Sequence, residues 1–273
     1  MATVEIRKNK FMKRLVCFFV VSMLAFLVSC TTDPDEDKSE WNAAEVCPET
    51  GTNAYDMPNR GTFTDVRDGN VYRYTTIGGQ VWMAENLRYD APYSTCSNDT
   101  SFIRQYCELI EHECETEACC KESLCRTFGR YYSIIENGEE FGLIDKALAD
   151  SVCPKGWHIP TKEEWKTLNN AMRIDGEPSG NTASRMKSAD SDFFAISKKH
   201  LNESDRTYVG TDNCALTVLP SGFMFQDGIT KKFRASFLTS TQINNDFVYT
   251  FVVQNYTDYI SNYYRNSIRC VMD

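Results

Sequence analysis

The stretch that decides the fold covers residues 153–165 and reads C-P-K-G-W-H-I-P-T-K-E-E-W. Pro154 and Gly156 predict a tight turn directly after the cysteine. Apolar and polar positions then alternate over residues 157–160, which predicts a short strand. A cysteine, a turn and a strand in so short a segment indicate a structural element around which the rest of the chain packs, rather than a catalytic loop.

A helix is expected directly after this strand. Thr161 is a favourable N-cap residue, and Glu164 three positions later completes a capping box. Trp165, Leu168 and Met172 recur at helical spacing, which predicts one apolar face. We therefore expect this helix to turn that face toward the core.

Length and charge describe a folded, exported chain. The 273 residues suffice for one large domain or two small ones, and a hydrophobic content of 42% supports a packed core. The first 29 residues carry five Lys/Arg and one Glu, so the remainder has 24 basic and 37 acidic residues and a formal charge of −13. This acidic balance argues against nucleic acid as a partner. Acidic balance is also common among secreted proteins and does not by itself indicate a function.

The N-terminus has the features of a bacterial lipoprotein signal. Lys13 and Arg14 precede an apolar run over residues 15–28, which is too short to span a bilayer. Residues 27–30 read L-V-S-C, the form of a lipobox, with an apolar residue at −3 and a small one at −1. We expect cleavage before Cys30 and a diacylglycerol on its thiol.

The signal leads into a polar tether. A signal that begins at Met12 is as complete as one that begins at Met1, so the sequence leaves the start open. Residues 31–39 are polar and acidic, which predicts a flexible tether. We expect a bacterial envelope protein that touches the membrane through its lipid alone. Because Thr31 follows the cysteine, we expect the outer membrane, and the sequence leaves open whether the protein faces the periplasm or the surface. The predicted divisions are a signal peptide (1–29), a lipid-anchored tether and lead-in (30–60) and a folded domain (61–273).

Ten cysteines remain after Cys17 and Cys30 are assigned to the signal and the anchor. An even number in an exported chain predicts a disulfide framework. Zinc is the alternative for the five cysteines that crowd between residues 107 and 125, but these lack paired C-x-x-C spacing. We therefore expect disulfides and no cofactor.

Strand patterns occupy both halves of the folded region. Residues 71–77 are rich in β-formers, Gly78-Gly79 supplies a two-residue hairpin turn, and residues 80–83 return as the second strand. Further short strands are expected at 214–218, 222–225 and 233–240. Strict alternation over 247–253 predicts a half-buried strand.

Five motifs carry a family resemblance. They read D-x-R-D-G-x-x-Y at 65–72, I-G-G-Q-V-W-M-A-E-N-L at 77–87, G-R-Y-Y at 129–132, C-P-K-G-W-H-I-P-T-x-x-E-W at 153–165 and S-I-R-C-V-M-D at 267–273. In this combination and order they resemble the Fibrobacter succinogenes major paralogous domain, a cell-surface or secreted bacterial domain of poorly defined function. The resemblance implies a disulfide-stapled α+β fold similar to that of C-type lectins, with short antiparallel strands, two or more helices and long loops.

The resemblance also implies two disulfides, Cys153 with Cys270 and Cys96 with Cys125. Between the latter two, residues 97–124 are longer than the family spacing and bring four more cysteines. Residues 102–124 lack Gly and Pro and predict helix, so we expect a cysteine-rich helical insertion, either a decorated surface loop or a dedicated binding module.

The remaining pairings stay open at this point. The four cysteines of the insertion are expected to pair among themselves, although the neighbours Cys119 and Cys120 are not expected to join each other. Cys47 with Cys214 follows only by elimination.

Signals for catalysis are weak. The sequence has no G-x-S-x-G or H-E-x-x-H motif. Of its three histidines, we expect His112 and His200 to be solvated and His158 to be structural. Glu163 and Glu164 are explained by helix capping and the helix dipole. The segment 157–165 is also similar to one in formylglycine-generating enzymes, but no reactive cysteine pair or metal-ligand set can be matched.

Calcium-dependent sugar binding is also disfavoured. Lectins of this fold use E-P-N or Q-P-D with a later W-N-D to supply oxygen ligands. Residues 177–179 read E-P-S and lack the amide, and residues 244–246 read N-N-D and lack the tryptophan.

We therefore predict a noncatalytic, surface-anchored lipoprotein that binds a glycan, a polymer or a protein. The alternatives are a hydrolase-like cell-surface enzyme with a site of scattered residues and a structural envelope protein.

In lectin-like folds, loops before the final strand form the variable ligand face. The corresponding interval here, residues 242–264, holds five tyrosines and four asparagines, a composition typical of recognition loops. Tyr249 is expected in the core. The candidate ligand-binding residues, expected around a turn at Thr257-Asp258, are Asn255, Tyr256, Tyr259, Asn262 and Tyr263.

Overall fold

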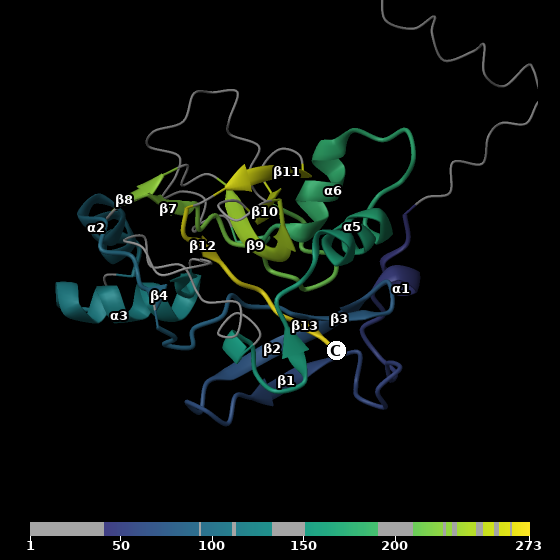
Figure 1. Cartoon of the computed structure of the whole chain (residues 1–273), viewed down its shortest axis with the longest axis horizontal. Helices are drawn as coiled ribbons and strands as arrows, with labels where there is room; N and C mark the ends of the chain where they lie inside the picture. Colours follow the sequence, from purple (N-terminus) through teal and green to yellow (C-terminus); the bar gives the residue numbers. More distant parts are fainter. Residues whose placement is uncertain are drawn as a thin grey trace, which may run out of the picture. The chain divides into compact units, whose positions relative to one another are not determined.

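In the computed structural model the described residues belong to one compact unit, Ser39–Asp273 (Figure 1). The described residues are 41–92, 94–110, 113–132, 151–190, 210–225, 228–230, 234–243, 248–253, 257–262 and 264–273. The expected signal and lipidation site at Cys30 lie outside them, as do His112 and His200. None of the helices in these ranges is long and apolar enough to cross a membrane.

The first sheet has the strand order β1-β2-β3-β13-β6, and its neighbours pair antiparallel. Its strands are β1 (Arg60–Thr64), β2 (Val71–Ile77), β3 (Gln80–Met83), β6 (Trp157–His158) and β13 (Val271–Met272). The β2–β3 hairpin and its turn are confirmed. Gly78 and Gly79 both have positive φ, 56° and 85°, the backbone that a tight two-residue hairpin turn requires.

The second sheet has the order β11-β10-β9-β12-β5-β4, in which the β12–β9 pair alone is parallel. Its strands are β4 (Ser94–Thr95), β5 (Tyr131–Tyr132), β9 (Ala235–Gln242), β10 (Val248–Val253), β11 (Thr257–Asn262) and β12 (Asn266–Ser267). A separate hairpin pairs β7 (Phe223–Phe225) with β8 (Gly228–Thr230). The last residues of the chain thus run from β12 in the second sheet to β13 in the first sheet.

Helix α5 (Lys162–Ala171) confirms the expected helix after residue 160. Thr161 and Glu164 form the complete capping box, and Trp165, Leu168 and Met172 are fully buried. The Trp165 ring lies 4.5 Å from that of Phe251 in the second sheet and 4.6 Å from that of Trp82 in the first. This one aromatic side chain therefore packs against both sheets, as expected for the centre of the fold.

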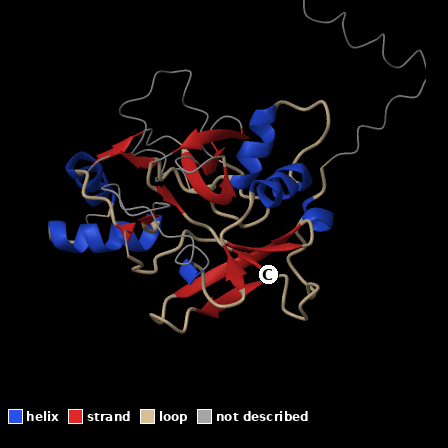
Figure 2. Cartoon of the chain, in the orientation of Figure 1, coloured by secondary structure: helices blue, strands red, loops and turns tan. Residues whose placement is uncertain are grey.

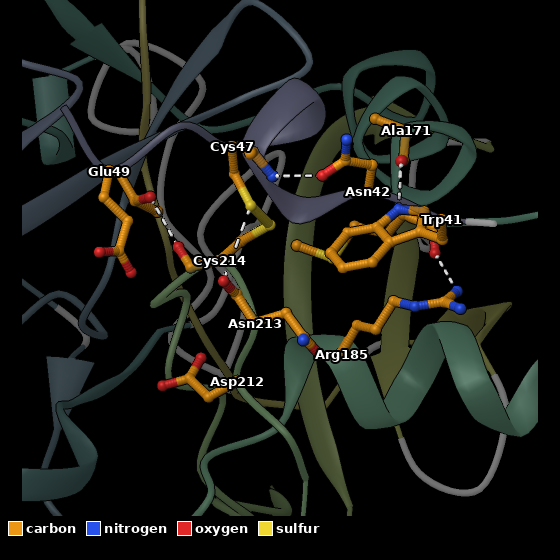
Figure 3. Close-up of a disulfide and its surroundings, with 12 residues drawn as sticks. Trp41, Asn42, Cys47, Glu49, Ala171, Arg185, Asp212, Asn213 and Cys214 are labelled. Carbon is orange, nitrogen blue, oxygen red and sulfur yellow. Dashed lines mark hydrogen bonds between the residues drawn. A yellow bond between two sulfur atoms is a disulfide. The ribbon is translucent and has the colours of Figure 1, made fainter. Parts of the chain in front are cut away.

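The lead-in before β1 packs against the core through helix α1 (Ala43–Val46) and a disulfide (Figure 3). Trp41 Nε1 donates to the carbonyl of Ala171, and the guanidinium of Arg185 lies 4.6 Å from the Trp41 ring centroid. Arg185 belongs to helix α6 (Ser179–Met186). Residues from Trp41 onward are thereby part of the folded unit.

The insertion consists of two helices rather than the single helix expected over 102–124. They are α2 (Thr100–Leu109) and α3 (Glu117–Phe128), which pack against each other (Figure 2). The bond Cys107–Cys120 joins the two helices, and Cys114–Cys119 ties Cys114, which precedes α3, to the first turn of that helix. The absence of Gly and Pro did not predict this break, which is marked by Thr116, the N-cap of α3, whose side chain accepts from Cys119 N.

Five disulfides join cysteines within the described residues. They are Cys47–Cys214, Cys96–Cys125, Cys107–Cys120, Cys114–Cys119 and Cys153–Cys270. The two pairings that the resemblance implied are therefore present. The four cysteines of the insertion pair among themselves without joining the neighbours Cys119 and Cys120.

Two expected strands differ from the structure. Residues 214–218 form turns with one isolated bridge at Val218, because Ala215 and Thr217 have positive φ and cannot extend. Strand β10 is buried on both faces rather than one, because consecutive residues from Thr250 to Val253 are all buried, and α5 packs against the strand. Tyr249, expected in the core, is only partly buried, and Lys162 Nζ lies 3.7 Å from its ring centroid. The α+β class with disulfides is confirmed, and the likeness to C-type lectins stays a prediction.

Candidate functional site

The ligand-binding residues expected from the sequence are only partly within the described structure. Tyr259 and Asn262 lie in β11, paired with Phe251 and Val248 of β10. The turn expected at Thr257-Asp258 is wrong, because both residues are paired in the same strand. Asn255, Tyr256 and Tyr263 lie outside the described residues. The binding face expected at this hairpin therefore remains a prediction.

A cleft of about 410 Å³ lies elsewhere, between the first sheet, helix α3 and the segment before β7. Four arginines line it: Arg73, Arg88, Arg126 and Arg269. Among the described residues of its lining, Glu85 is the one carboxylate. We call this cavity the arginine cleft. Its formal charge excess is three positive charges, in a chain whose total charge is negative.

Arg269 forms the floor of the arginine cleft and is 1% exposed. Its Nη2 and Nε donate to Asn86 Oδ1 at 2.8 and 3.2 Å, and its other donors reach the carbonyls of Leu216 and Thr217. In the described part of the chain no carboxylate lies within ion-pair distance of Arg269. Burial lowers the pKa of this guanidinium to about 9, so it remains protonated at neutral pH.

The Cys153–Cys270 disulfide places Arg269 at this position. Cys270 directly follows the arginine and is fully buried. Val271 then pairs with Trp82 and with His158, which holds the end of the chain between β3 and β6. The arginine is therefore carried on a segment fixed by a covalent bond and by two strands.

The carbonyl groups that receive Arg269 come from an unusual turn at residues 212–217. Asp212, Ala215 and Thr217 all have positive φ, between 45° and 53°. The Asp212 carboxylate accepts from Thr217 N at 2.7 Å and from Thr217 Oγ1 at 2.9 Å, and the Cys47–Cys214 disulfide crosses the same turn (Figure 3). Such conformations are costly for residues other than glycine and persist where the surroundings impose them.

Asn86 connects Arg269 to the insertion. Its Nδ2 donates to the carbonyl of Phe128 at 2.8 Å, at the last residue of α3. The next residue, Gly129, has a φ of 76°, and a Cβ there would lie 2.6 Å from the Asn86 Cβ. Only glycine therefore lets the end of α3 approach this closely, and the same approach brings Arg126 to the cleft.

Arg88 and Glu85 line the wall of the arginine cleft. The Arg88 guanidinium lies 4.4 Å from the Tyr72 ring centroid, and its Nη2 donates to the carbonyl of Val71 at 2.5 Å. Arg88 Nη1 is 3.5 Å from Glu85 Oε1. Arg88 Nε is buried and has no hydrogen-bond partner among the described residues, so the site holds one unsatisfied donor.

Arg73 and Arg126 lie at the mouth of the arginine cleft, with side chains that are 52% and 67% exposed. Arg73 Nε is 3.8 Å from Glu85 Oε2, and Arg126 Nη2 is 3.6 Å from Glu122 on the same helix. Exposed contacts of this length are weak, so both guanidinium groups are available to a ligand. Fixed, permanently charged donors of this kind bind anions.

The expected structural role of His158 agrees with its contacts. Its Nε2 lies 2.8 Å from Glu164 Oε1, and its Nδ1 lies 2.7 Å from Asp273 Oδ1. The hydrogen bond to Glu164, with that to Asp273, raises the pKa of His158 against the opposing effect of burial. We call these three residues the His158 cluster; it ties β6, α5 and the C-terminal residue together.

Other acidic groups are already bound by the protein. Both carboxylate oxygens of Glu177, in the E-P-S segment, accept from Arg185, and the pKa of Glu177 is lowered to about 2 chiefly by this contact. Within the described ranges no group of three His, Cys, Asp or Glu side chains is arranged to hold a metal ion. The 244–246 segment lies outside those ranges.

Sequence reasoning missed the arginine cleft, although signals were present. Glu85 and Asn86 interrupt the apolar run of one quoted motif, and Arg269 interrupts the apolar run of another. Polar side chains in otherwise buried segments point to a buried polar network or a site.

Comparison with known proteins identifies the family alone. No curated protein and no solved structure matches the chain. The family model of the Fibrobacter succinogenes major domain matches residues 75–272, a range that contains every arginine of the cleft except Arg73. Because the match covers well over half of the sequence, this chain belongs to the Fibrobacter succinogenes major domain family.

Proposed function

We propose that the chain is a noncatalytic binding protein of the bacterial cell envelope, anchored by lipid on Cys30, whose folded unit binds a glycan, polymer or protein ligand. The observation that carries the proposal is the arginine cleft. Its volume, about 410 Å³, lies within the range of small-molecule sites, and its lining combines apolar surface with a few convergent polar groups.

The groups of the arginine cleft suit binding better than proton transfer. Guanidinium groups keep their protons at neutral pH, and this holds even for Arg269 with its pKa of about 9. Acid–base catalysis needs a group that exchanges a proton near the working pH, and glycoside hydrolysis commonly needs two carboxylates. Glu85 is one carboxylate, and it lies beside two arginines.

The anchor is supported by the lipobox at residues 27–30 and by the polar segment that follows it. The compact unit begins at Ser39, so about eight residues would separate it from the lipid on Cys30. Several acyl chains on one N-terminus hold a protein stably, where a single chain is marginal.

One experiment separates binding from the alternatives. The chain from position 30 onward, kept soluble by Cys30→Ser, is applied to a polysaccharide array and then incubated with each retained polymer. We expect retention of at least one polymer and no change in its length. A shortened polymer would instead support the cell-surface hydrolase. If no glycan and no envelope protein is retained, the structural role becomes the better explanation.

The anchor has its own test. Mass spectrometry of the membrane-extracted protein should find a lipidated Cys30 as the first residue. The full chain with Cys30→Ser should leave the lipid-anchored fraction, whereas Cys17→Ser, a change within the signal core, should not alter anchoring. A Cys30→Ser chain that is processed and still lipidated would contradict the assignment.

A further inference from the structure

The arginines of the cleft differ from Arg67 and Arg185 in how their positive charge is neutralised. Arg67 is paired with Asp65 at 2.6 Å, and Arg185 is paired with Glu177. In the arginine cleft, four guanidinium groups share one carboxylate, and Arg269 at the floor has none within ion-pair distance. Asp212 and Glu85 offset part of the Arg269 charge from beyond ion-pair distance, and an anionic ligand would neutralise the positive charge that remains in the cleft.

We propose that the arginine cleft recognises the acid group of an acidic glycan, a singly charged carboxylate or sulfate ester carried on a hydroxyl-rich sugar. This inference rests on the proposed function and names the ligand of the same site. Planar guanidinium groups match such oxyanions with paired N–H donors. Arg73 and Arg126, whose side chains are exposed at the mouth, reach the acid group.

Glu85 offsets part of the positive charge of the arginine cleft. It lies between Arg73 and Arg88, at 3.8 and 3.5 Å, and its Oε2 also accepts from the backbone N of Arg73 at 2.7 Å. A carboxylate at this position weakens the attraction of the cleft for an anion, and the excess of three positive charges in the lining still favours one.

The size of the arginine cleft favours a sugar over an acidic protein surface. Stable protein interfaces bury roughly 800 Å² on each partner, whereas a concave site of about 410 Å³ suits a small ligand or part of a chain. The apolar side chains of Ala84 and Leu219 in the lining can contact the nonpolar edge of a sugar ring. Arg269, which is 1% exposed, acts on the ligand through its charge rather than by direct contact.

Titration calorimetry of the soluble Cys30→Ser chain tests the inference with four defined probes. They are oligogalacturonate, sulfated galactan oligosaccharides, neutral galactan oligosaccharides and polyglutamate. We expect binding of one or both acidic sugars, which identifies the source of the acid group. We expect no binding of the neutral sugar, and weaker binding of polyglutamate. Affinity should fall as salt rises, because the mouth arginines are exposed to solvent.

Variants at the mouth locate the site. Arg73→Gln/Arg126→Gln should weaken acidic-sugar binding about 100-fold, since each lost hydrogen bond to a charged group corresponds to roughly tenfold. The matched control is Lys166→Gln/Arg173→Gln, which removes the same charge from residues outside the cleft that are 57% and 52% exposed. The control should retain affinity within about twofold. Unfolding curves that coincide with the parent exclude a folding defect in both variants.

Three results would overturn the inference. Equal binding of polyglutamate would show that the cleft recognises negative charge alone, with no contribution from the sugar. Equal weakening by the control variant would show that net charge, not the cleft, attracts the ligand. Binding of a neutral glycan, unchanged in Arg73→Gln/Arg126→Gln, would place recognition elsewhere and would leave the proposed binding function intact. Failure of the proposed function is different, because then no array polymer is retained at all.

Discussion

The arginine cleft and the His158 cluster flank the same last strand, β13, and balance their charges in opposite ways. In the His158 cluster one imidazole meets two carboxylates, those of Glu164 and Asp273, at 2.7 to 2.8 Å. In the arginine cleft four guanidinium groups meet one carboxylate. The difference shows how to interpret charged groups near a core: a cluster whose groups are hydrogen-bonded to one another holds elements together, whereas a cleft with surplus positive charge is suited to an anionic ligand.

The largest expected effect comes from breaking the bond that positions both regions. Cys153→Ala/Cys270→Ala removes a disulfide with a sequence separation of 117, which we expect to lower the free energy of unfolding by about 4–5 kcal/mol. Denaturant unfolding measures this loss. The control Cys114→Ala/Cys119→Ala, with a separation of 5, should cost about 2 kcal/mol. Equal losses would show that this disulfide does not order the two regions.

Arg269→Leu should have the next largest effect. It leaves three buried acceptors, Asn86 Oδ1 and the carbonyls of Leu216 and Thr217, without their donor. Unsatisfied groups of this kind cost roughly 1–3 kcal/mol each, so we expect a loss of about 3 kcal/mol in unfolding free energy after the relief of the buried charge. A variant as stable as the parent would mean that burying the charged guanidinium costs as much free energy as its hydrogen bonds contribute.

Glu85→Gln tests the surplus positive charge of the cleft by increasing it. It removes the one carboxylate of the cleft lining but keeps an oxygen that can accept from the backbone N of Arg73. We expect acidic-sugar affinity to rise about threefold to tenfold, an effect that high salt should reduce. Calorimetry at two salt concentrations measures it. An unchanged or lower affinity would show that Glu85 itself binds the ligand.

The smallest expected effect is the pH dependence of the His158 cluster. The pKa of His158 is raised above 6.5, so its contribution to stability is complete below pH 6.5 and is lost as pH rises through the raised value. Relative to His158→Gln, the parent should therefore lose stability as the pH increases above 6.5. Because the His158 side chain is 36% exposed, we expect less than about 1 kcal/mol.

Glu164 titrates in the opposite sense. Its contacts with His158 and Thr161 outweigh its burial and lower its pKa below 4.5, so its contribution is present above pH 4.5 and is lost as pH falls through the lowered value. Unfolding curves of the parent and Glu164→Gln at pH 3, 5 and 7 should diverge toward neutral pH. Parallel curves would mean that the cluster contributes nothing through its charges.

The sequence by itself determined the elements that depend on near neighbours. The capping box of Thr161 and Glu164 and the Gly78-Gly79 turn are interactions within four residues, so their patterns are visible in the chain. The even number of cysteines likewise predicted a disulfide framework, and the family resemblance placed two of its bonds.

Tertiary structure alone decided the rest. The bond Cys107–Cys120 holds α2 against α3, and a contact with Asp212 holds the left-handed residue Thr217. The arginine cleft joins Arg73, Arg126 and Arg269, which are far apart in the sequence. Each arginine alone resembles an ordinary surface or core residue. Their charges form a site only because Gly129, the turn at 212–217 and the Cys153–Cys270 bond bring distant backbone segments together, and electrostatic potential depends on distance in space rather than on separation along the chain.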